Sequence, residues 1–286
     1  MTLTIHKTIQ DFHAATFETL MRHESQNMIL LGNIFIGLNG EDKTEWRDPA
    51  NWVMVTVQDV RGILLTALMT PPHNITLYAI DNIVNHAAID CLIKGLRNYE
   101  IPGVTTEKSL AEEFAKAYGK QYEITMNQRI YELTVVNPDI PTCGTLRLAE
   151  EKDMSFLPFW LSSFFPSARN DETMPIPIEA EPFINRIDRR NLWILENEDG
   201  VPVSMVGSSR ELVTVRSIAP VYTPPYFRGR GYASSSVAQL SRLLLDKGFT
   251  RCVLYTDLAN PTSNSIYQKI GYRAICNSLE LKFVTV

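Results

Sequence analysis

The sequence lacks any apolar run near the roughly 18–20 residues that a membrane-spanning helix needs. Its opening stretch, MTLTIHKTIQDFHAATF, contains no apolar segment suited to a secretory signal. The cysteines are few, and none of them forms a CxxC pair: Cys91, Cys143, Cys252 and Cys276. We therefore expect a cytoplasmic protein with free thiols, no disulfide, no metal site and no membrane partner.

A strong excess of charge is also missing. The formal net charge is −5, with 11 basic and 17 acidic residues in 1–140 and 16 basic and 15 acidic residues in 141–286. Neither half presents the polybasic surface that general nucleic-acid binding requires, so we expect no nucleic-acid partner. The arginines of the second half are therefore of interest as local sites.

The segment VVNPDIPTCGT (135–145) interrupts the pattern with two prolines and a Cys-Gly pair, which are typical of a linker. It predicts two domains, 1–139 and 140–286. In 140–286, strand-like runs alternate with helical patterns, which predicts an α/β fold with a mixed sheet flanked by helices. The first half repeats this order of elements. An internal duplication explains the repetition, and two unrelated α/β halves remain the alternative.

The expected elements follow from hydrophobic periodicity and turn residues. In the first half we expect helices at 12–22, 25–36, 84–97 and 108–119, strands at 51–59, 62–72, 74–80 and 102–105, and a hairpin-like end at 121–136. In the second half we expect helices at 152–164, 177–188, 232–247 and 260–270, and strands at 146–149, 191–197, 201–209, 212–223, 251–258 and 272–283.

The stretch YTPPYFRGRGYASSS (222–236) joins an expected strand to an expected helix. Pro224-Pro225 cannot continue a strand ladder, because proline has no N–H. Gly229 and Gly231 allow positive φ angles and a close approach of a ligand to the backbone. A helix that begins near Tyr232 adds free N–H groups and the positive end of its dipole, which suit a phosphate. A plain glycine-rich turn with solvated arginines is the alternative interpretation.

Two common phosphate motifs do not fit this turn. A Walker loop needs GxxxxGK[ST], and a dinucleotide fingerprint needs a third glycine where Ser234 stands. A second group of residues follows the next strand in DLANPTSNSIYQKIGY (257–272). There Asn260 is suited to cap a helix that starts at Pro261, and Asn264 and Tyr267 lie three residues apart on one helical face.

Together the two segments resemble the GNAT acetyltransferases, which transfer an acyl group from acetyl-CoA to an amine. The resemblance covers roughly residues 143–286. The family signature Arg/Gln-x-x-Gly-x-Gly/Ala aligns with residues 226–231, where Tyr226 departs from the usual Arg or Gln and Gly229 and Gly231 are in place. The later motif matches at Asn260, Ser263, Asn264, Tyr267, Lys269, Gly271 and Tyr272.

The resemblance implies a set of site residues. The backbone of Val221, Tyr222 and Thr223 would bind the pantetheine arm as an added strand does. Residues 228–233 would hold the pyrophosphate, mainly through backbone N–H groups: Arg228, Gly229, Arg230, Gly231, Tyr232 and Ala233. Asn260, Ser263 and Asn264 would contact the other side of the CoA arm. Tyr267 would lie near the sulfur and act as general acid to the departing thiolate.

The general base stays open at this stage. All five histidines lie at or before residue 86, and none can be placed beside the CoA. Asp257, Glu172, Glu179 and Glu181 are carboxylate candidates, and a water chain is an equal alternative. The first half lacks the signature, so we expect a degenerate GNAT-like domain there that walls off the acceptor pocket.

The sequence thus predicts an enzyme, an acetyl-CoA-dependent N-acetyltransferase acting on a primary amine of a small molecule or peptide. Two alternatives remain open. One is a non-catalytic CoA-binding sensor or interaction module. The other is an aminoacyl transferase with paired GNAT-like halves, which the acidic balance disfavours.

Overall fold

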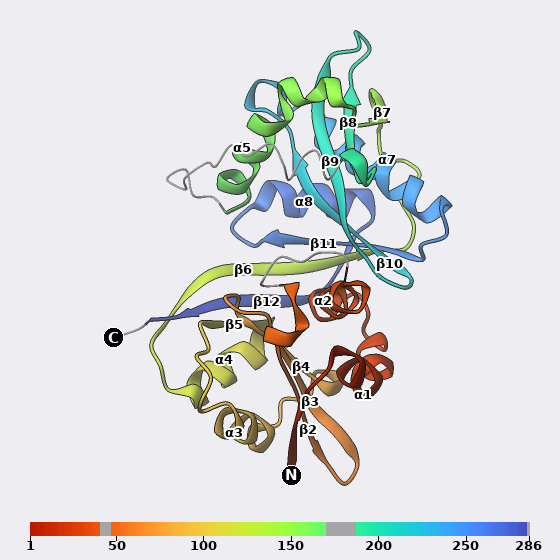
Figure 1. The fold of residues 1–286 in the computed structure, drawn as a ribbon. Helices are drawn as coiled ribbons and strands as arrows, with labels where there is room; N and C mark the ends of the chain where they lie inside the picture. Colours follow the sequence, from red (N-terminus) through yellow and green to blue (C-terminus); the bar gives the residue numbers. More distant parts are fainter. Residues whose placement is uncertain (41–46, 170–186, 285–286) are drawn as a thin grey trace. The chain divides into compact units, whose positions relative to one another are not determined.

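The computed structural model describes residues 1–40, 47–169 and 187–284 (Figure 1). The chain divides into two units. Unit 1 comprises Met1–Gln128 and Cys276–Val286, and unit 2 comprises Arg129–Ile275. Two long strands, β6 (Tyr122–Leu133) and β12 (Arg273–Phe283), each pass from one unit into the other along the chain.

Unit 1 contains a mixed sheet whose strands lie in the order β1-β2-β3-β4-β5-β12-β6. Its other elements are β1 (Thr2–His6), α1 (Ile9–Met21), α2 (Met28–Asn39), β2 (Val53–Asp59), β3 (Gly62–Met69), β4 (Ile75–Ala79), α3 (His86–Gly95), β5 (Gly103–Glu107) and α4 (Lys108–Tyr118). Strands β1 to β4 are antiparallel neighbours, whereas β4 and β5 pair in parallel because α3 connects them.

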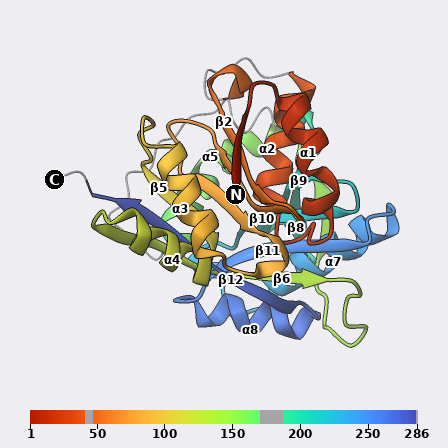
Figure 2. The same cartoon turned by 90° about the horizontal axis from the view of Figure 1, so that it is seen from below.

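The two faces of the unit 1 sheet are covered by different helices. Alternate residues of β2 to β4 pack with α3 and α4 in one core, in which Val55, Leu77, Leu92 and Phe114 are buried. Helices α1 and α2 lie on the opposite side of these strands (Figures 1 and 2). Burial on both faces explains why β2 to β4 read as nearly continuous apolar runs.

Unit 2 contains strands in the order β6-β11-β10-β9-β8-β7. Its other elements are β7 (Thr145–Leu148), α5 (Leu157–Arg169), β8 (Leu192–Glu196), β9 (Pro202–Glu211), β10 (Val215–Tyr222), α7 (Tyr232–Asp246), β11 (Arg251–Asp257) and α8 (Pro261–Ile270). Strands β7 to β10 are antiparallel neighbours, and β10 and β11 are parallel. From β8 onward the order of elements along the chain therefore matches the order from β2 onward.

Two cores hold unit 2 together, one on each face of its sheet. Trp193 of β8 points into the core that α7 and α8 cover, which also buries Val237 and Ile270. Its neighbours Leu192 and Ile194 point into the opposite core, under α5. This alternation is the period-two pattern of a strand that is buried on both faces.

The last strands of the two units are exchanged. The strand beside β5 in unit 1 is β12, paired from Ser278↔Glu107 to Lys282↔Gly103, although β12 follows α8 in the chain. The strand beside β11 in unit 2 is β6, although β6 follows α4. The structural division therefore differs from the expected domains 1–139 and 140–286. Residues 129–139 belong to unit 2 and 276–286 to unit 1, because strand pairing rather than chain order defines each unit.

Most expected elements are confirmed to within a few residues. The hairpin-like end expected at 121–136 is wrong, since β6 is one continuous strand there, and β1 was not expected. The helix expected at 177–188 lies mostly outside the described residues. Across the part of the chain that the structure describes, no helix has both the length and the apolar character that crossing a membrane requires.

Candidate functional site

In unit 2, strands β10 and β11 separate after a short stretch of pairing. Their parallel register runs from Val215↔Arg251 to Ser217↔Val253, and β10 then continues to Tyr222 with its antiparallel partner β9. No ladder pair joins the described residues 218–222 of β10 to β11. The end of β10 therefore presents an edge on the β11 side to which an extended ligand can add.

The end of β10 is held in place by side chains from two other segments. The Ser204 Oγ donates to the Tyr222 carbonyl over 3.1 Å and lies 2.9 Å from the Thr223 Oγ1. The Arg228 Nε donates to the Thr223 carbonyl over 3.0 Å, and the guanidinium lies 5.9 Å from the centre of the Tyr222 ring. Arg228 thus fixes the strand end through its side chain.

The turn after β10 has the backbone shape of an anion site. Gly229 and Gly231 adopt φ angles of +77° and +81°, and no heavy atom lies within 4 Å of where a Cβ would stand on either residue. Gly231 caps α7 without any side-chain hydrogen bond. The first bond inside the helix runs from the Ser235 N–H to the Gly231 carbonyl, so the N–H groups of residues 232–234 have no partner within the helix. A phosphate fits these donors and the helix dipole.

Helix α8 follows β11 and begins as expected. The Asn260 side chain accepts the Ser263 N–H over 3.0 Å, Pro261 opens the helix, and Gly271 ends it with φ at +118°. The Asn264 amide donates to the Asp257 carbonyl over 3.0 Å and to the Asn260 carbonyl over 2.7 Å. Because both amide hydrogens are used in this way, Asn264 holds the start of α8 against the end of β11.

Tyr267 lies on the buried side of α8, with 8% of its surface exposed. Burial raises the pKa of Tyr267 to about 12, and a hydrogen bond with the Ser263 side chain opposes part of that rise. Its ring contacts those of Tyr131 and Tyr272, with centroids 6.4 Å and 6.0 Å away. A phenol in this environment stays protonated at neutral pH and can donate a hydrogen bond.

Of the four candidate bases, Asp257 lies within the described residues. The Asp257 carboxylate lies at the carboxyl end of β11, where it accepts the Ala259 N–H over 2.8 Å in a turn. Glu172, Glu179 and Glu181 lie outside the described residues. The structure also brings Tyr131 of β6 to this site. The sequence did not indicate Tyr131, because its hydrogen-bond partners Asn264 and Gln268 lie more than 130 positions later in the chain.

Residues 155–272 match the model of the Acetyltransferase (GNAT) family, and this match contains the turn, α7 and α8. This part of the chain is therefore similar to a GNAT domain. A GNAT domain supports an acyl-CoA-dependent N-acetyltransferase as the general activity. Strands β6 and β7 lie before the matched residues, and β12 lies entirely after them.

Solved structures share the fold over nearly the whole chain. One is a Drosophila protein (TM-score 0.65, 11% identity, 99% of this chain and 98% of that one). Another is a GCN5-related N-acetyltransferase from Sphaerobacter thermophilus (0.61, 14%, 98% and 95%). A third is a GNAT-family acetyltransferase from Colwellia psychrerythraea (0.57, 10%, 99% and 100%). A search of curated proteins finds no significant match. The matches extend beyond the GNAT domain, so unit 1 is also GNAT-like in fold.

The corresponding turn of unit 1 has different chemistry. After β4, Asp81 and Asn82 adopt positive φ angles of 54° and 60°, and the Asp81 carboxylate pairs with Arg22 over 3.4 Å. The Asn85 side chain caps α3 by accepting the Ala88 N–H over 3.0 Å. The turn before α3 therefore carries the Asp81 carboxylate and the capping side chain of Asn85, whereas no side chain caps the start of α7.

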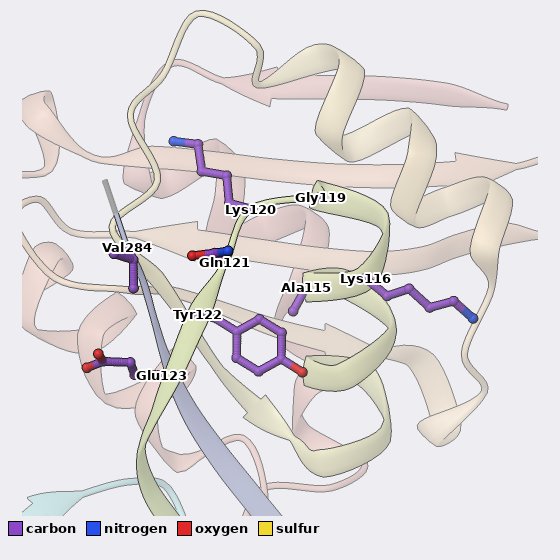
Figure 3. Close-up of a pocket in the computed structure, with 8 residues that line it drawn as sticks. All are labelled: Ala115, Lys116, Gly119, Lys120, Gln121, Tyr122, Glu123 and Val284. Carbon is purple, nitrogen blue, oxygen red and sulfur yellow. The ribbon is translucent and has the colours of Figure 1, made fainter. Parts of the chain in front are cut away.

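A hollow of about 580 Å³ lies elsewhere in unit 1, between the end of α4 and the start of β6 (Figure 3). Lys116 and Lys120 border it, but their ammonium groups extend in opposite directions (Figure 3). The hollow therefore offers no convergent set of charges. Among the described residues, no group of three or more His, Cys, Asp and Glu is placed to hold a metal ion, and the four cysteines are free thiols.

Proposed function

We propose that this protein transfers the acetyl group of acetyl-CoA to a primary amine of a small molecule or peptide, by direct attack of the amine on the thioester. The observation that carries the proposal is the open end of the β10 ladder together with the start of α7, where no side chain caps the helix. The edge suits the amide groups of a pantetheine arm, and the helix start suits a pyrophosphate. GNAT membership of residues 155–272 supports the same assignment.

In this proposal the CoA arm binds along the backbone of Val221 to Thr223, and its pyrophosphate binds the backbone of Arg228 to Ala233. Arg230 is exposed and can add charge, while Arg228 contributes mainly by holding the Thr223 carbonyl. Asn260 and Ser263 line the arm from the start of α8. Asn264 supports this lining from behind, since its amide hydrogens already bond two carbonyls.

The chemical step needs an amine that has lost its proton, because only the neutral amine carries the attacking electron pair. The nitrogen attacks the thioester carbonyl, the carbon–sulfur bond then breaks, and its electron pair leaves on sulfur. After the attack the nitrogen carries one proton too many, and it loses that proton to solvent or to a carboxylate such as Asp257. Tyr267 donates a hydrogen bond or its proton to the thiolate and, if it gives its proton, regains one from the same solvent or carboxylate. The products are an amide and CoA with a free thiol.

We further propose that unit 1 binds no CoA. The Asp81 carboxylate repels an anion at the turn after β4, and the Asn85 side chain occupies donors at the start of α3.

Calorimetry with acetyl-CoA, followed by thiol release over a panel of amines, tests the proposal. We expect binding, and turnover with at least one amine. Tyr267→Phe should lower kcat by about 100-fold, the range of a general acid, and leave the affinity for acetyl-CoA within a few-fold. An unchanged kcat would remove Tyr267 from the mechanism.

The non-catalytic CoA sensor is the second candidate, and the burial of Tyr267 favours it, since a reacting group must reach the sulfur. Binding of acetyl-CoA without turnover on any amine would support the sensor. Turnover only with aminoacyl-tRNA as donor would support the aminoacyl transferase. An absence of acetyl-CoA binding would contradict both CoA-based functions.

A further inference from the structure

We propose that Tyr131, on strand β6, is a positioning residue for the reaction, acting through the helix that carries Tyr267. The inference rests on the proposed function. Tyr131 precedes the residues that match the GNAT family, and nothing in its local sequence marks it. Its contacts in unit 2 connect it to the candidate site.

The hydroxyl of Tyr131 contacts two successive turns of α8. It donates to the Asn264 Oδ1 over 3.1 Å and accepts from the Gln268 Nε2 over 3.3 Å. These partners are four residues apart and so lie on one helical face. Tyr267 is next to Gln268 in the sequence and lies one turn after Asn264, and its ring lies 6.4 Å from that of Tyr131. A single buried hydroxyl thereby sets the rotation of α8 at the level of Tyr267.

Asn264 carries this constraint to the start of the helix. Its oxygen is held by Tyr131, and its amide holds the carbonyls of Asp257 and Asn260. An amide whose oxygen has a fixed donor points its two hydrogens in fixed directions. The orientation of the Asn260 turn, which would line the CoA arm, therefore depends on the Tyr131 hydroxyl.

The residues that follow Tyr131 in the chain also hold the C-terminal end of α8. The Asn137 N–H donates to the Ile270 carbonyl over 2.8 Å, and its side-chain amide donates to the Lys269 carbonyl over 3.1 Å. These carbonyls are among those that a helix end leaves without partners. A Cβ on Gly271 would come within 2.9 Å of the Val135 carbonyl, so the backbones meet closely there. Residues 131–137 thus clamp α8 at both ends.

Tyr131 is fully buried, and the contributions of its ring and its hydroxyl can be separated by substitution. The ring packs in the core under α7 and α8. The hydroxyl contributes only the two bonds to α8. Tyr131→Phe keeps the packing and removes those bonds, which makes it the appropriate variant.

The first test compares steady-state kinetics of the full chain. Tyr131→Phe should lower kcat about tenfold, because a small misplacement of a reacting group costs rate, and should leave the KM for acetyl-CoA within about twofold. Tyr78→Phe is the matched control: Tyr78 of unit 1 is also buried, and its hydroxyl bonds His23 over 2.8 Å. It should leave kcat unchanged. An equal fall in kcat in both variants would reduce Tyr131 to a general stability effect and overturn the proposal.

A double-mutant cycle with Asn264→Ala tests the route of the effect. If Tyr131 acts through Asn264, the double variant should have nearly the same kcat as Asn264→Ala alone. Fully multiplicative losses would show that the two side chains act independently, and would overturn the proposed route.

Hydrogen exchange gives a readout that needs no substrate. Tyr131→Phe should speed exchange in peptides covering 257–268, with α7 unaffected, whereas Tyr78→Phe should leave both segments unchanged. Unaltered exchange in 257–268 would overturn the positioning role. If the wild-type protein shows no turnover, the proposed function fails by itself, and the exchange result still decides whether Tyr131 braces α8.

Discussion

The carboxylate of Asp153 is a buried charge in unit 2 with three hydrogen bonds. It accepts from the two terminal nitrogens of Arg147 over 2.6 Å and 2.8 Å, and from the Glu150 N–H over 2.8 Å. Arg147 also donates to Glu196 over 2.7 Å, so one guanidinium ties β7, β8 and the turn before α5 together. Removal of one partner of such a pair leaves a buried charge uncompensated.

We therefore expect Asp153→Ala to lower the free energy of unfolding by about 3 kcal/mol. Urea denaturation at neutral pH measures this change. Lys152→Ala is the control, because its ion pair with Glu150 is exposed and should contribute less than about 1 kcal/mol. A loss for Asp153→Ala no larger than that of the control would mean that the network adds nothing to stability.

The same carboxylate makes a pH-dependent contribution. Burial by itself would raise the pKa of Asp153, but the hydrogen bonds from Arg147 and the Glu150 N–H outweigh it, so the pKa lies below its usual value. The stabilisation is therefore complete above the unfolded pKa of about 3.9 and is lost as pH falls through the lower folded value. Urea midpoints of wild type and Asp153→Asn should differ near neutral pH and converge below about pH 4. A difference between the two urea midpoints that increased as the pH fell would contradict this prediction.

At the scale of elements, the start of α7 depends on its backbone shape. An alanine at Gly231 has room for its Cβ but must adopt a φ of +81°, which costs about 1 kcal/mol or more. We expect Gly231→Ala to weaken acetyl-CoA binding about tenfold, since the turn relaxes away from the shape that presents its N–H groups.

Gly200 supplies the control for that substitution. It has a φ of +73° and open space in the turn between β8 and β9, so Gly200→Ala carries similar backbone strain away from the candidate site. Calorimetry should show unchanged acetyl-CoA affinity for Gly200→Ala. Equal weakening in both variants would mean that strain lowers affinity through overall stability.

Helix ends and glycine turns could be predicted from the sequence because they depend on contacts between residues close together in the chain. Asn260 and Gly271 bound α8 through contacts within a few residues, and the glycines after β10 mark the turn directly. Strand β1 was missed because it is a short edge strand whose Ile5 is exposed. Tyr131 and the pairing of Arg147 with Asp153 gave no sequence signal, since each depends on which segments the fold brings together.

At the scale of the whole molecule, the C-terminal strand is part of the core of unit 1. Leu281 of β12 is fully buried there with Phe114 of α4, while the adjacent Lys282 is exposed. Leu281→Ala should lower the stability of unit 1 by about 2–5 kcal/mol, and Lys282→Ala should have little effect.

Hydrogen exchange shows which part of the Leu281→Ala variant loses stability. Leu281→Ala should speed exchange in α3 and α4 of unit 1 and leave α7 of unit 2 protected. Faster exchange in α7 with α4 unaffected would contradict the assignment of β12 to unit 1.

The order of elements along the chain was sufficient to predict two α/β halves, but not which strand completes which sheet. The linker-like segment 135–145 suggested a boundary there, yet β6 is already in unit 2 at Tyr131. Pairing between β5 and β12 joins residues more than 170 positions apart, and no local pattern encodes such a partner. The motifs that resemble the GNAT family could be recognised in the sequence because they depend only on α7, α8 and their turns.

The exchange of β6 and β12 also has a consequence for synthesis. Domains commonly fold in the order in which the ribosome makes them, N-terminal first. Here the core of unit 1 cannot be completed until Leu279, Leu281 and Phe283 exist, and by then every residue of unit 2 has been made. The sheet of unit 1, the unit that is synthesised first, is therefore completed last. While residues 129–275 of unit 2 are being synthesised, the edge of β5 that later pairs with β12 has no partner strand.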